Sequence, residues 1–187
     1  AQEAALGEMR RNIDAWWPAV EAGCQAIVIT ASGCGAMVQE YGHLLRDDPA
    51  YASKAKRVSA LAKDISDILL NEDLSVLKPL TTNQKVAVHC PCTLQHAMRQ
   101  GNRSVETILV KVGFEIAATK DAHLCCGSAG TYSILQPKMA KRLLANKVEA
   151  LSFDNPTQIV TSNIGCQLHI ETEAPVPVNH WIELLDC

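Results

Sequence analysis

The sequence predicts an α/β fold with parallel sheets, and three observations support this class. Short runs rich in β-branched residues alternate with longer stretches in which apolar residues recur at helical spacing. The short runs are apolar along their whole length, which is typical of strands buried on both faces. Strands that alternate with helices form βαβ units, whose strands lie parallel. Four strands are predicted, at 26–30, 85–90, 114–119 and 158–163.

Two helices stand out between these runs. One is predicted over 50–70, where Asp48 can cap it, Pro49 suits its first turn, and apolar residues recur every third or fourth position. The other is predicted over 137–151, where Lys147 is the only polar residue on an apolar face. The chain also opens within a predicted helix.

An internal repeat indicates two halves. The segment 71–85 contains a proline and has no periodicity, which indicates a boundary. On each side of it, a helix end is followed by a strand that ends in Thr and then by Gly-Cys. Asn12 precedes Cys34 by 22 positions, and Asn146 precedes Cys166 by 20.

The repeat predicts two domains, residues 1–78 and 79–187, each a Rossmann-like βαβ unit with a parallel sheet. The first has no counterpart to the front half of the second, so we expect a first repeat truncated at its N-terminus. The alternative is a chance likeness between two ordinary βαβ units.

Composition excludes several classes of function. The chain is 48% hydrophobic and 20% charged, which is typical of a globular protein. A net charge of −3, no basic run and only 4% aromatic residues argue against a nucleic-acid partner. No apolar run approaches the roughly 20 residues that a transmembrane helix needs.

Cysteines carry the chemical signal, because three groups of them follow predicted strands. Cys90 and Cys92 follow the second strand, Cys125 and Cys126 the third, and Cys166 the fourth. Open parallel sheets bind ligands beyond the carboxyl ends of their strands, so these thiols should converge. Gaps of 32 and 39 residues separate the groups, and a local zinc knuckle is much shorter. Metal or redox chemistry is favoured over disulfides, because no secretory signal is present.

The adjacent pair Cys125 and Cys126 requires a backbone turn, because neighbouring strand residues point to opposite faces. Gly127 permits the turn, since glycine adopts positive φ at little cost. The small residues 128–130 let backbone N–H groups approach a thiolate-bound cluster, and such donors raise its reduction potential. The alternative is a pair of buried cysteines that pack as small apolar residues.

Three motifs resemble the cysteine-rich CCG repeat, which occurs in heterodisulfide reductases and in 2-hydroxy-acid oxidoreductases. They are "HCPCTLQH" (89–96), "HLCCGSAGTY" (123–132) and "TSNIGCQLH" (161–169). Around them, "NIDAWWPAVEAG" (12–23) and "NHWIELL" (179–185) are similar to iron–sulfur subunits of bacterial glycolate oxidases. The resemblance covers essentially the whole chain.

The resemblance implies an iron–sulfur cluster, expected to be [4Fe–4S], bound by four thiolates: Cys92, Cys125, Cys126 and Cys166. By the same resemblance, Cys34 matches the last cysteine of the first repeat. Fuller repeats end in C-x-x-C, whereas here His169 stands three positions after Cys166. His169 is therefore either a ligand, as histidine is in Rieske centres, or a structural residue.

Three further residues lie beside these motifs. Cys90 would share a strand face with Cys92, but the family's Pro-Cys pair favours Cys92 as the ligand. His89 and His123 each precede a motif. They are interpreted as hydrogen-bond donors to a ligand sulfur or as core and turn residues.

The resemblance also implies a role in electron transfer. Flavin-containing glycolate oxidase subunits would oxidise glycolate to glyoxylate, and this module would relay electrons toward the quinone pool. The chain contains no C-x₂-C-x₂-C ferredoxin motif and is not expected to be catalytic alone. A cytoplasmic location, or a peripheral one at the inner face of the cell membrane, follows from this role.

Two other functions stay open. Three cysteines with a fourth cysteine or His169 suffice for a structural zinc ion, which would make the chain a docking module. The adjacent Cys125 and Cys126 would also suit a thiol redox domain like that of heterodisulfide reductase.

Overall fold

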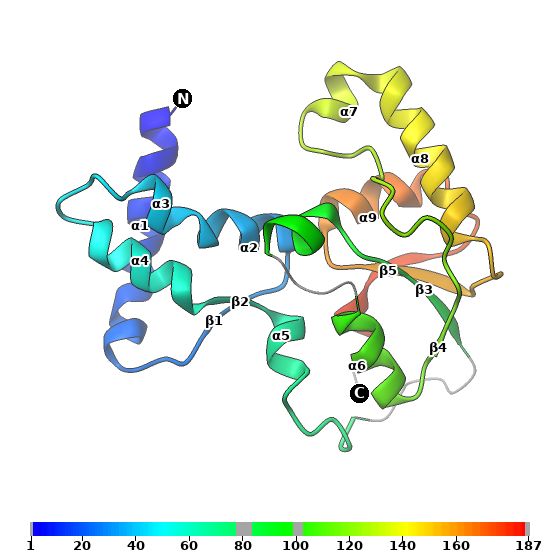
Figure 1. The fold of residues 1–187 in the computed structure, drawn as a ribbon, viewed down its shortest axis with the longest axis horizontal. Helices are drawn as coiled ribbons and strands as arrows, with labels where there is room; N and C mark the ends of the chain where they lie inside the picture. Colours follow the sequence, from blue (N-terminus) through cyan, green and yellow to red (C-terminus); the bar gives the residue numbers. More distant parts are fainter. Residues whose placement is uncertain (1, 78–83, 99–102, 186–187) are drawn as a thin grey trace. The chain divides into compact units, whose positions relative to one another are not determined.

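The computed structural model describes residues 2–77, 84–98 and 103–185. The chain divides into two compact units, Ala1–Ile68 and Leu69–Cys187, each with its own sheet (Figure 1). All strand pairings in the described parts are parallel. The predicted α/β class with parallel sheets is therefore confirmed.

The first unit is mainly helical and contains a two-stranded sheet. In this sheet β1 pairs with β2, and Ile27 lies opposite Ala62. The elements in chain order are α1 (Gln2–Glu21), β1 (Ile27–Ile29), α2 (Ser32–Gln39), α3 (Tyr41–Leu44), α4 (Ala52–Leu61), β2 (Ala62–Asp64) and α5 (Ile65–Leu69).

The helix predicted over 50–70 is wrong in its middle, because two helices, α4 and α5, are separated there by a strand. The helix α4 ends at Leu61, and the next three residues form β2. The backbone turns extended at Ala62, with ψ 116, and its polar groups pair with β1 instead of continuing the helix. Asp64 then accepts hydrogen bonds from the N–H and the hydroxyl of Ser66, at 2.9 and 2.7 Å. Helical spacing of apolar residues continues through a strand this short, so the pattern hides the break.

Asp48 lies one turn earlier than a helix cap would. It accepts backbone hydrogen bonds from Ala50 and Tyr51 at 3.0 and 3.1 Å, and α4 begins only at Ala52. Asp48 also forms an ion pair with Arg10 of α1 at 2.9 Å. It therefore orders the turn before α4 and fixes that turn to α1.

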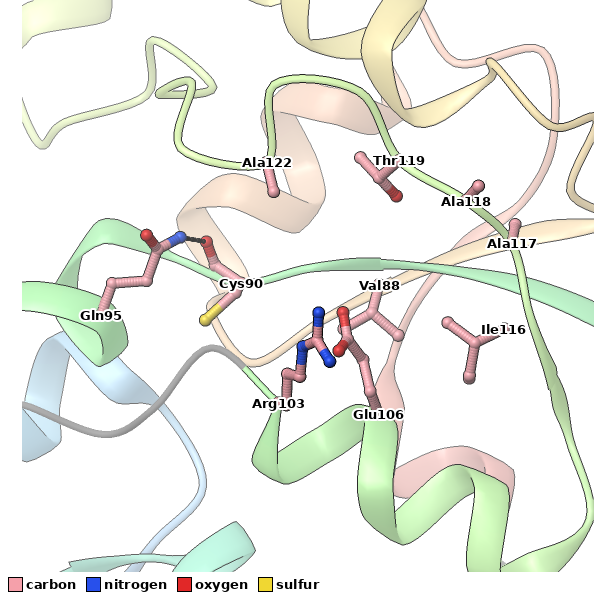
Figure 2. A pocket seen from close by; sticks show the side chains of 10 residues that line it. All are labelled: Val88, Cys90, Gln95, Arg103, Glu106, Ile116, Ala117, Ala118, Thr119 and Ala122. Atoms are coloured by element: carbon pink, nitrogen blue, oxygen red, sulfur yellow. Dashed lines mark hydrogen bonds between the residues drawn. The ribbon is translucent and has the colours of Figure 1, made fainter.

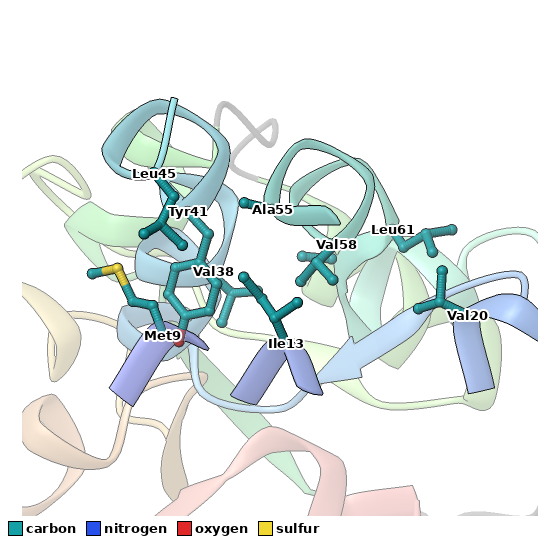
Figure 3. Packing of buried hydrophobic residues seen from close by; sticks show 10 residues of the cluster. Met9, Ile13, Val20, Val38, Tyr41, Leu45, Ala55, Val58 and Leu61 are labelled. Carbon is teal, nitrogen blue, oxygen red and sulfur yellow. The ribbon is translucent and has the colours of Figure 1, made fainter. Parts of the chain in front are cut away.

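The core of the first unit lies between α1 and the helices α2 to α4. Figure 3 shows apolar side chains from these helices directed toward one another. The residues of this core are Met9, Ile13, Val20, Val38, Tyr41, Leu45, Ala55, Val58, Leu61 and Ala62. Its polar contacts lie at the edge, where Asn12 donates to the Tyr41 hydroxyl at 2.9 Å.

The second unit contains a four-stranded sheet with the order β4-β3-β5-β6. Its two central strands pair over four residues, from Val86 opposite Gln158 to His89 opposite Thr161. The strands are β3 (Lys85–His89), β4 (Glu115–Ile116), β5 (Gln158–Thr161) and β6 (Val178–His180).

The four predicted strands are confirmed as elements, although β4 is only two residues long. The N–H of Ala117 continues the pairing of β4 with β3 by one hydrogen bond, to the carbonyl oxygen of Val86 at 2.9 Å. The edge strand β6 was not predicted, because "VNH" is short, partly polar and preceded by Pro177.

Helices connect these strands. The helix predicted over 137–151 is confirmed at both ends. It is α8, which has a proline in its first turn. The elements are η1 (Thr93–Ala97, a π-helix), α6 (Ser104–Val112), α7 (Tyr132–Leu135), α8 (Pro137–Leu151), α9 (Ile164–Glu171) and η2 (Trp181–Leu185).

The domain boundary predicted between residues 78 and 79 lies outside the described residues. The assignment of residues 1–78 and 79–187 to two repeats stays a prediction. Within the described ranges, no helix combines the length and the apolar character needed to cross a bilayer.

Candidate metal centre

Three connections carry cysteines to one edge of the second unit's sheet. Cys90 and Cys92 follow β3, Cys125 and Cys126 lie in the loop after β4, and Cys166 lies in the first turn of α9, after β5. Because β3 pairs in parallel with both β4 and β5, all three connections leave the sheet at its carboxyl edge. The structure thus brings together the loops that the sequence spacing associates.

Gly127 creates the turn that follows the two adjacent cysteines. Its φ of +88 lies in the region that favours glycine, so the turn predicted there is confirmed. A Cβ at this position would lie 2.6 Å from the carbonyl oxygen of Ala140 and 3.2 Å from Cβ of Leu143, both on α8. The Gly127 N–H donates to Sγ of Cys125 at 3.3 Å. Glycine is therefore required both by the backbone conformation and by the close approach of α8.

Three donor atoms gather beyond the carboxyl ends of β3 and β5. A ring nitrogen of His89 and the Sγ atoms of Cys126 and Cys166 all lie within 4.8 Å of one another. His89 is 1% exposed and Cys126 is 2% exposed. Cys126 is part of the apolar core of this unit, with Ala87, Ala117, Leu144, Leu151, Ile159, Ile170 and Val178.

The pKa values of Cys126 and Cys166 move in opposite directions. A hydrogen bond from Cys166 lowers the pKa of the Cys126 thiol to about 4, although burial acts in the opposite direction. His89 and the backbone of Ser128 also stabilise the thiolate. The same hydrogen bond, together with burial, raises the pKa of Cys166. At neutral pH the pair is one thiolate and one thiol, and the thiolate is the form that binds metals.

Cys92 and Cys125 form a second pair of thiols. Burial raises the pKa of Cys92, and the charge of Cys125 and a hydrogen bond with it act in the same direction. Cys125 and Cys92 also act to raise the pKa of Cys166, after the larger effects of Cys126 and of burial. Each pair joins cysteines from two different connections of the sheet.

Asn163 fixes the start of α9 and with it Cys166. Its side-chain Oδ1 accepts hydrogen bonds from the N–H groups of Gly165 and Cys166, at 3.0 and 3.2 Å. This is the bonding pattern of a helix N-cap, which satisfies two of the N–H groups left free at a helix start. Cys166 is thus held in a defined first turn beside the sheet.

Lys147 places a buried cation beside the thiols. The side chain of this α8 residue is 1% exposed, and its Nζ donates to the carbonyl oxygen of Ala122 at 2.9 Å. Burial lowers the pKa of Lys147, whereas the charges of Cys126 and Cys92 act in the opposite direction. Buried charges require compensation, and thiolates here provide it.

The donor set suits a soft or borderline metal centre. Thiolates and imidazole select zinc and iron–sulfur clusters, whereas Mg²⁺ and Ca²⁺ prefer oxygen ligands. Two observations fit such a group: the buried ring nitrogens of His89 have no nitrogen or oxygen hydrogen-bond partner among the described residues and interact with the Cys126 thiolate, and α8 packs closely over Gly127. The predicted ligands for such a centre are Cys92, Cys125, Cys126 and Cys166, of which Cys126 and Cys166 belong to the close group of donor atoms.

A comparison with protein families agrees with this donor set. Residues 86–171 match the cysteine-rich domain family named CCG. These residues form a CCG domain.

Curated proteins with similar sequences carry names from oxidative metabolism. The chain is 50% identical over 186 residues to the glycolate oxidase iron-sulfur subunit of Escherichia coli (strain K12), covering 100% of this chain and 45% of that protein. It is 33% identical over 147 residues to the probable glycolate oxidase iron-sulfur subunit of Bacillus subtilis (strain 168), covering 78% and 33%.

A more distant relative is lactate utilization protein A of Bacillus licheniformis, 25% identical over 187 residues, with 95% of this chain and 75% of that protein covered. The chain therefore spans less than half the length of the two glycolate oxidase subunits that it resembles.

Two predicted ligands are not among the three donor atoms of the CCG domain. Cys34 belongs to the first unit, where it is exposed on α2. His169 lies on α9, one turn after Cys166. Its Nε2 is buried and has no hydrogen-bond partner among the described residues, but it is not part of the group formed by His89, Cys126 and Cys166. Ligation by Cys34 or His169 stays a prediction.

The other cysteines have ordinary surroundings. The described cysteines, Cys24 and Cys34 included, are all free thiols, and Cys24 packs against the core of the first unit. Burial raises the pKa of the Cys90 thiol to about 11, so Cys90 stays neutral at pH 7. Cys187 lies outside the described residues.

Two buried polar residues beside the cysteine loops, His89 and Lys147, have only weak signals in the sequence. His89 is predicted as a hydrogen-bond donor or a core residue, and strand alternation places it on the same face as buried Ala87. Lys147 was visible as a single polar residue on an apolar helix face. Both signals point to polar groups buried next to the cysteine loops.

A cavity of about 360 Å³ lies beside the thiols, at the carboxyl ends of β3 and β4. Figure 2 shows the side chains of Arg103 and Glu106 directed into it, next to the thiol of Cys90. Burial raises the pKa of the Glu106 carboxyl, and Arg103 acts in the opposite direction. The cavity borders the cysteine loops through Cys90 and Ala122.

Proposed function

We propose that this chain is an electron-transfer module of an iron–sulfur oxidoreductase subunit of the glycolate oxidase type. The carrying observation is that Cys126 and Cys166, from two connections of the sheet, lie with His89 within 4.8 Å of one another, and that Cys92 and Cys125 follow neighbouring strands at the same edge. The 50% identity to a protein named glycolate oxidase iron-sulfur subunit supports the same function.

The residues of the CCG domain would bind the cluster and set its environment. Cys92, Cys125, Cys126 and Cys166 would bind as thiolates, and a [4Fe–4S] cluster would supply a one-electron carrier. The N–H of Gly127 already donates to Sγ of Cys125 at 3.3 Å. N–H donors to sulfur and a nearby cation such as Lys147 stabilise the reduced, more negative form. The apolar core around Cys126 excludes water.

The names of the relatives suggest the partners. Flavin-containing subunits would oxidise glycolate to glyoxylate, and the module would pass the electrons toward a quinone. These partners place it in the cytoplasm, or at the inner face of the cell membrane. Cys34, as the last cysteine of a first repeat, would be a ligand of that repeat.

Iron and sulfide content tests the proposal. The chain is purified anaerobically, reconstituted with iron and sulfide, and analysed for both elements and for visible absorption. We expect a brown protein with stoichiometric iron and acid-labile sulfide. Cys126→Ser should lose most of the iron, because it removes the buried thiolate, whereas the control Cys24→Ser in the first unit should retain it.

A colourless wild-type protein without iron after anaerobic reconstitution contradicts the proposal. So does equal iron content in Cys126→Ser and the wild type, since the cluster would then lie elsewhere.

One observation favours zinc as a second candidate. A single tetrahedral ion with bonds of about 2.1 Å to nitrogen and 2.3 Å to sulfur holds its ligands roughly 3.4–3.8 Å apart. The ligand atoms of His89, Cys126 and Cys166 lie within 4.8 Å of one another, close to that spacing. Stoichiometric zinc without sulfide in anaerobically prepared protein would establish a structural or docking module instead.

Thiol redox catalysis is less well supported. Cys126 has the lowered pKa of a reactive thiolate, but its side chain is 2% exposed. A disulfide substrate must reach the attacking sulfur, so burial argues against this role.

A further inference from the structure

We propose that the corner formed by α7 and the beginning of α8, residues 132–142, binds the surface of a membrane that contains anionic lipids. Its apolar side chains enter the lipid interface, and its basic side chains contact the headgroups. The inference deepens the proposed function, because a quinone is dissolved in the membrane. It names the face of the CCG domain that meets the lipid.

The first argument is an exposed apolar patch. The exposed fractions of Ile134, Leu135 and Met139 are 76%, 71% and 47%. None of the four residues of α7 is buried, although two of them are large and apolar. Single exposed apolar side chains are ordinary on a protein surface, but three within six residues form a patch. Such patches mark interaction surfaces.

The backbone holds this patch in place. The N–H of Leu135 donates to the carbonyl oxygen of Thr131 at 2.9 Å, which closes α7 as one helical turn. Next to the patch, Ala140 of α8 is buried, and its backbone lies close to Gly127. Figure 1 shows the corner at the end of α8 that points away from the sheet. The apolar side chains are therefore presented by ordered helix ends and not by a free loop.

The second argument is local charge. The chain has a net charge of −3, yet no acidic residue occurs from position 122 to position 148. Within that segment Lys138, Lys141 and Arg142 are exposed, and none of them forms an ion pair with another described residue. Lys138 and Arg142 are four residues apart, so they are neighbours on the face of α8 opposite buried Ala140 and Leu144. Such a basic patch on an acidic protein favours an anionic partner and orients the chain toward it.

The combination of apolar and basic side chains favours lipid over protein as the partner. Peripheral proteins bind anionic membranes through a few apolar side chains flanked by lysine and arginine. A stable protein interface buries about 800 Å² on each partner, and charged residues are depleted at its centre. A projecting corner with Lys138 between Leu135 and Met139 matches such an interface poorly. A second copy of this chain is also disfavoured, because it would bring like charges together.

The corner lies beside the candidate metal centre. The helix α7 begins six residues after Cys126, and the inward side of α8 contacts Gly127 through Ala140. Lipid bound at the outer side of this helix is therefore separated from the cysteine loop by a single helix. That position suits a module that passes electrons to an acceptor dissolved in the membrane.

Co-sedimentation with vesicles tests this surface. The chain is mixed at low salt with phosphatidylcholine vesicles, with or without phosphatidylglycerol, and the bound fraction is measured. We expect binding to the vesicles that contain phosphatidylglycerol, weaker binding at high salt, and little binding to phosphatidylcholine alone. In the triple variant Lys138→Gln, Lys141→Gln, Arg142→Gln the binding constant should fall about 100-fold, since each basic residue near the surface contributes a factor of about 5.

A matched control changes the net charge by the same amount elsewhere. Lys56, Arg57 and Lys63 are exposed residues of the first unit. Their joint replacement by Gln should retain most of the binding, because only charges within a Debye length of the lipid contribute. Equal losses in the two triple variants would mean that net charge, and not the corner, determines binding.

A second pair of variants tests the apolar contribution. Ile134→Ser with Leu135→Ser should weaken binding to the anionic vesicles about 10-fold or more, because the apolar area that enters the lipid is lost. Val76→Ser with Val110→Ser removes two apolar side chains that are also exposed, by 78% and 58%, and should bind like the wild type. All four positions are exposed, so each variant should fold, and circular dichroism checks this.

The outcomes separate this inference from the proposed function. Wild-type protein that does not bind phosphatidylglycerol vesicles overturns the surface, and so does binding that both corner variants retain. Corner variants that bind vesicles normally but no longer co-purify with flavin-containing subunits assign the corner to a protein partner and also overturn it. Vesicle binding needs no cluster. Iron-free protein that binds through the corner therefore supports the surface while it contradicts electron transfer, and iron-loaded protein that does not bind overturns the surface alone.

Discussion

The two units use the same local pattern, a strand followed by a helix with Gly-Cys in its first turn, and reach different results. In the second unit, Asn163 caps α9 and holds the N–H of Cys166 at 3.2 Å. In the first unit, Ala31 occupies the corresponding cap position of α2 and provides no side-chain bond, and Cys34 is exposed.

The interiors of the units differ in the same way. The first has an apolar core with Asn12 bonded to Tyr41 at its edge, and the polar side chains that its described residues bury are those of Ser32, Asp64 and Ser66. The second buries His89, Lys147 and Cys126 beside its apolar residues. The comparison teaches that a Gly-Cys helix start is not by itself a metal site. The neighbouring connections and the buried polar groups beneath them make the difference.

Glycine substitution should give the largest contrast between the units. Gly127 and Gly23 both have φ +88, but only Gly127 has backbone atoms where a Cβ would lie, 2.6 Å from the Ala140 oxygen. Gly127→Ala should lower the free energy of unfolding by about 3–5 kcal/mol, from strain and overlap together. Gly23→Ala has strain alone and should cost about 1–2 kcal/mol. Urea denaturation of both variants measures this; equal losses would mean that α8 does not constrain the turn.

Removal of the buried cation should act on the centre more than on the fold. Lys147→Met keeps the length of the side chain but removes the ammonium beside the thiols. We expect about 10–100-fold weaker iron binding, as for other residues that support ligands, and a lower reduction potential. Lys141→Met, on the exposed side of α8, is the control. An unchanged potential in Lys147→Met would show that its charge does not reach the cluster.

Exchange of the cap residues should give a smaller effect, of opposite sign in the two units. Asn163→Ala removes the bonds to Gly165 and Cys166 and should cost about 1 kcal/mol of unfolding free energy. Ala31→Asn offers α2 the same cap, since its extended backbone (φ −116, ψ 108) is similar to that of Asn163 (φ −142, ψ 116). It should stabilise the first unit by up to about 1 kcal/mol. Thermal unfolding of each variant checks both signs.

The smallest expected effect is a pH dependence at the opposite edge of the second unit. Lys85, 2.7 Å away, and the N–H of Ala118 hold the pKa of the Asp154 carboxyl below its usual value. Its stabilisation is present above the ordinary aspartate pKa of about 3.9 and is lost as the pH falls toward the lower folded value. Asp154→Asn should therefore differ from the wild type above about pH 5 and converge with it in acid. A difference that grows in acid would contradict this assignment.

The sequence predicts this fold well where periodicity and burial agree. The residues of α8 follow helical spacing and begin with a proline, and both ends match. The central strands β3 and β5 are apolar throughout, as buried parallel strands are. The prediction fails at β2, because a buried apolar residue at position 62 is compatible both with an apolar helix face and with a buried strand.

The sequence predicts the convergence of the cysteine loops but not the partners of the thiols. Spacing at crossover length associates Cys92, Cys125, Cys126 and Cys166, since the topology decides where connections leave a sheet. It does not decide which histidine meets them. The position of His169 after Cys166 suggests that it is a ligand. It is His89, however, that the register of β3 and β5 places beside the thiols. Register depends on the whole sheet, so no local motif reveals it.

The pairing of β3 with β5 has a consequence for the newly made chain. Thr157 donates to the carbonyl of Lys85 at 3.1 Å across 72 residues, and the same ladder places His89 beside the connection to Cys166. Such long-range contacts form late, because a long loop must close first. Until the ribosome has released β5 and α9, Cys126 lacks its partner Cys166, although β3 and β4 can already pair. Metal binding that needs both thiols would accordingly follow the synthesis of the last connection.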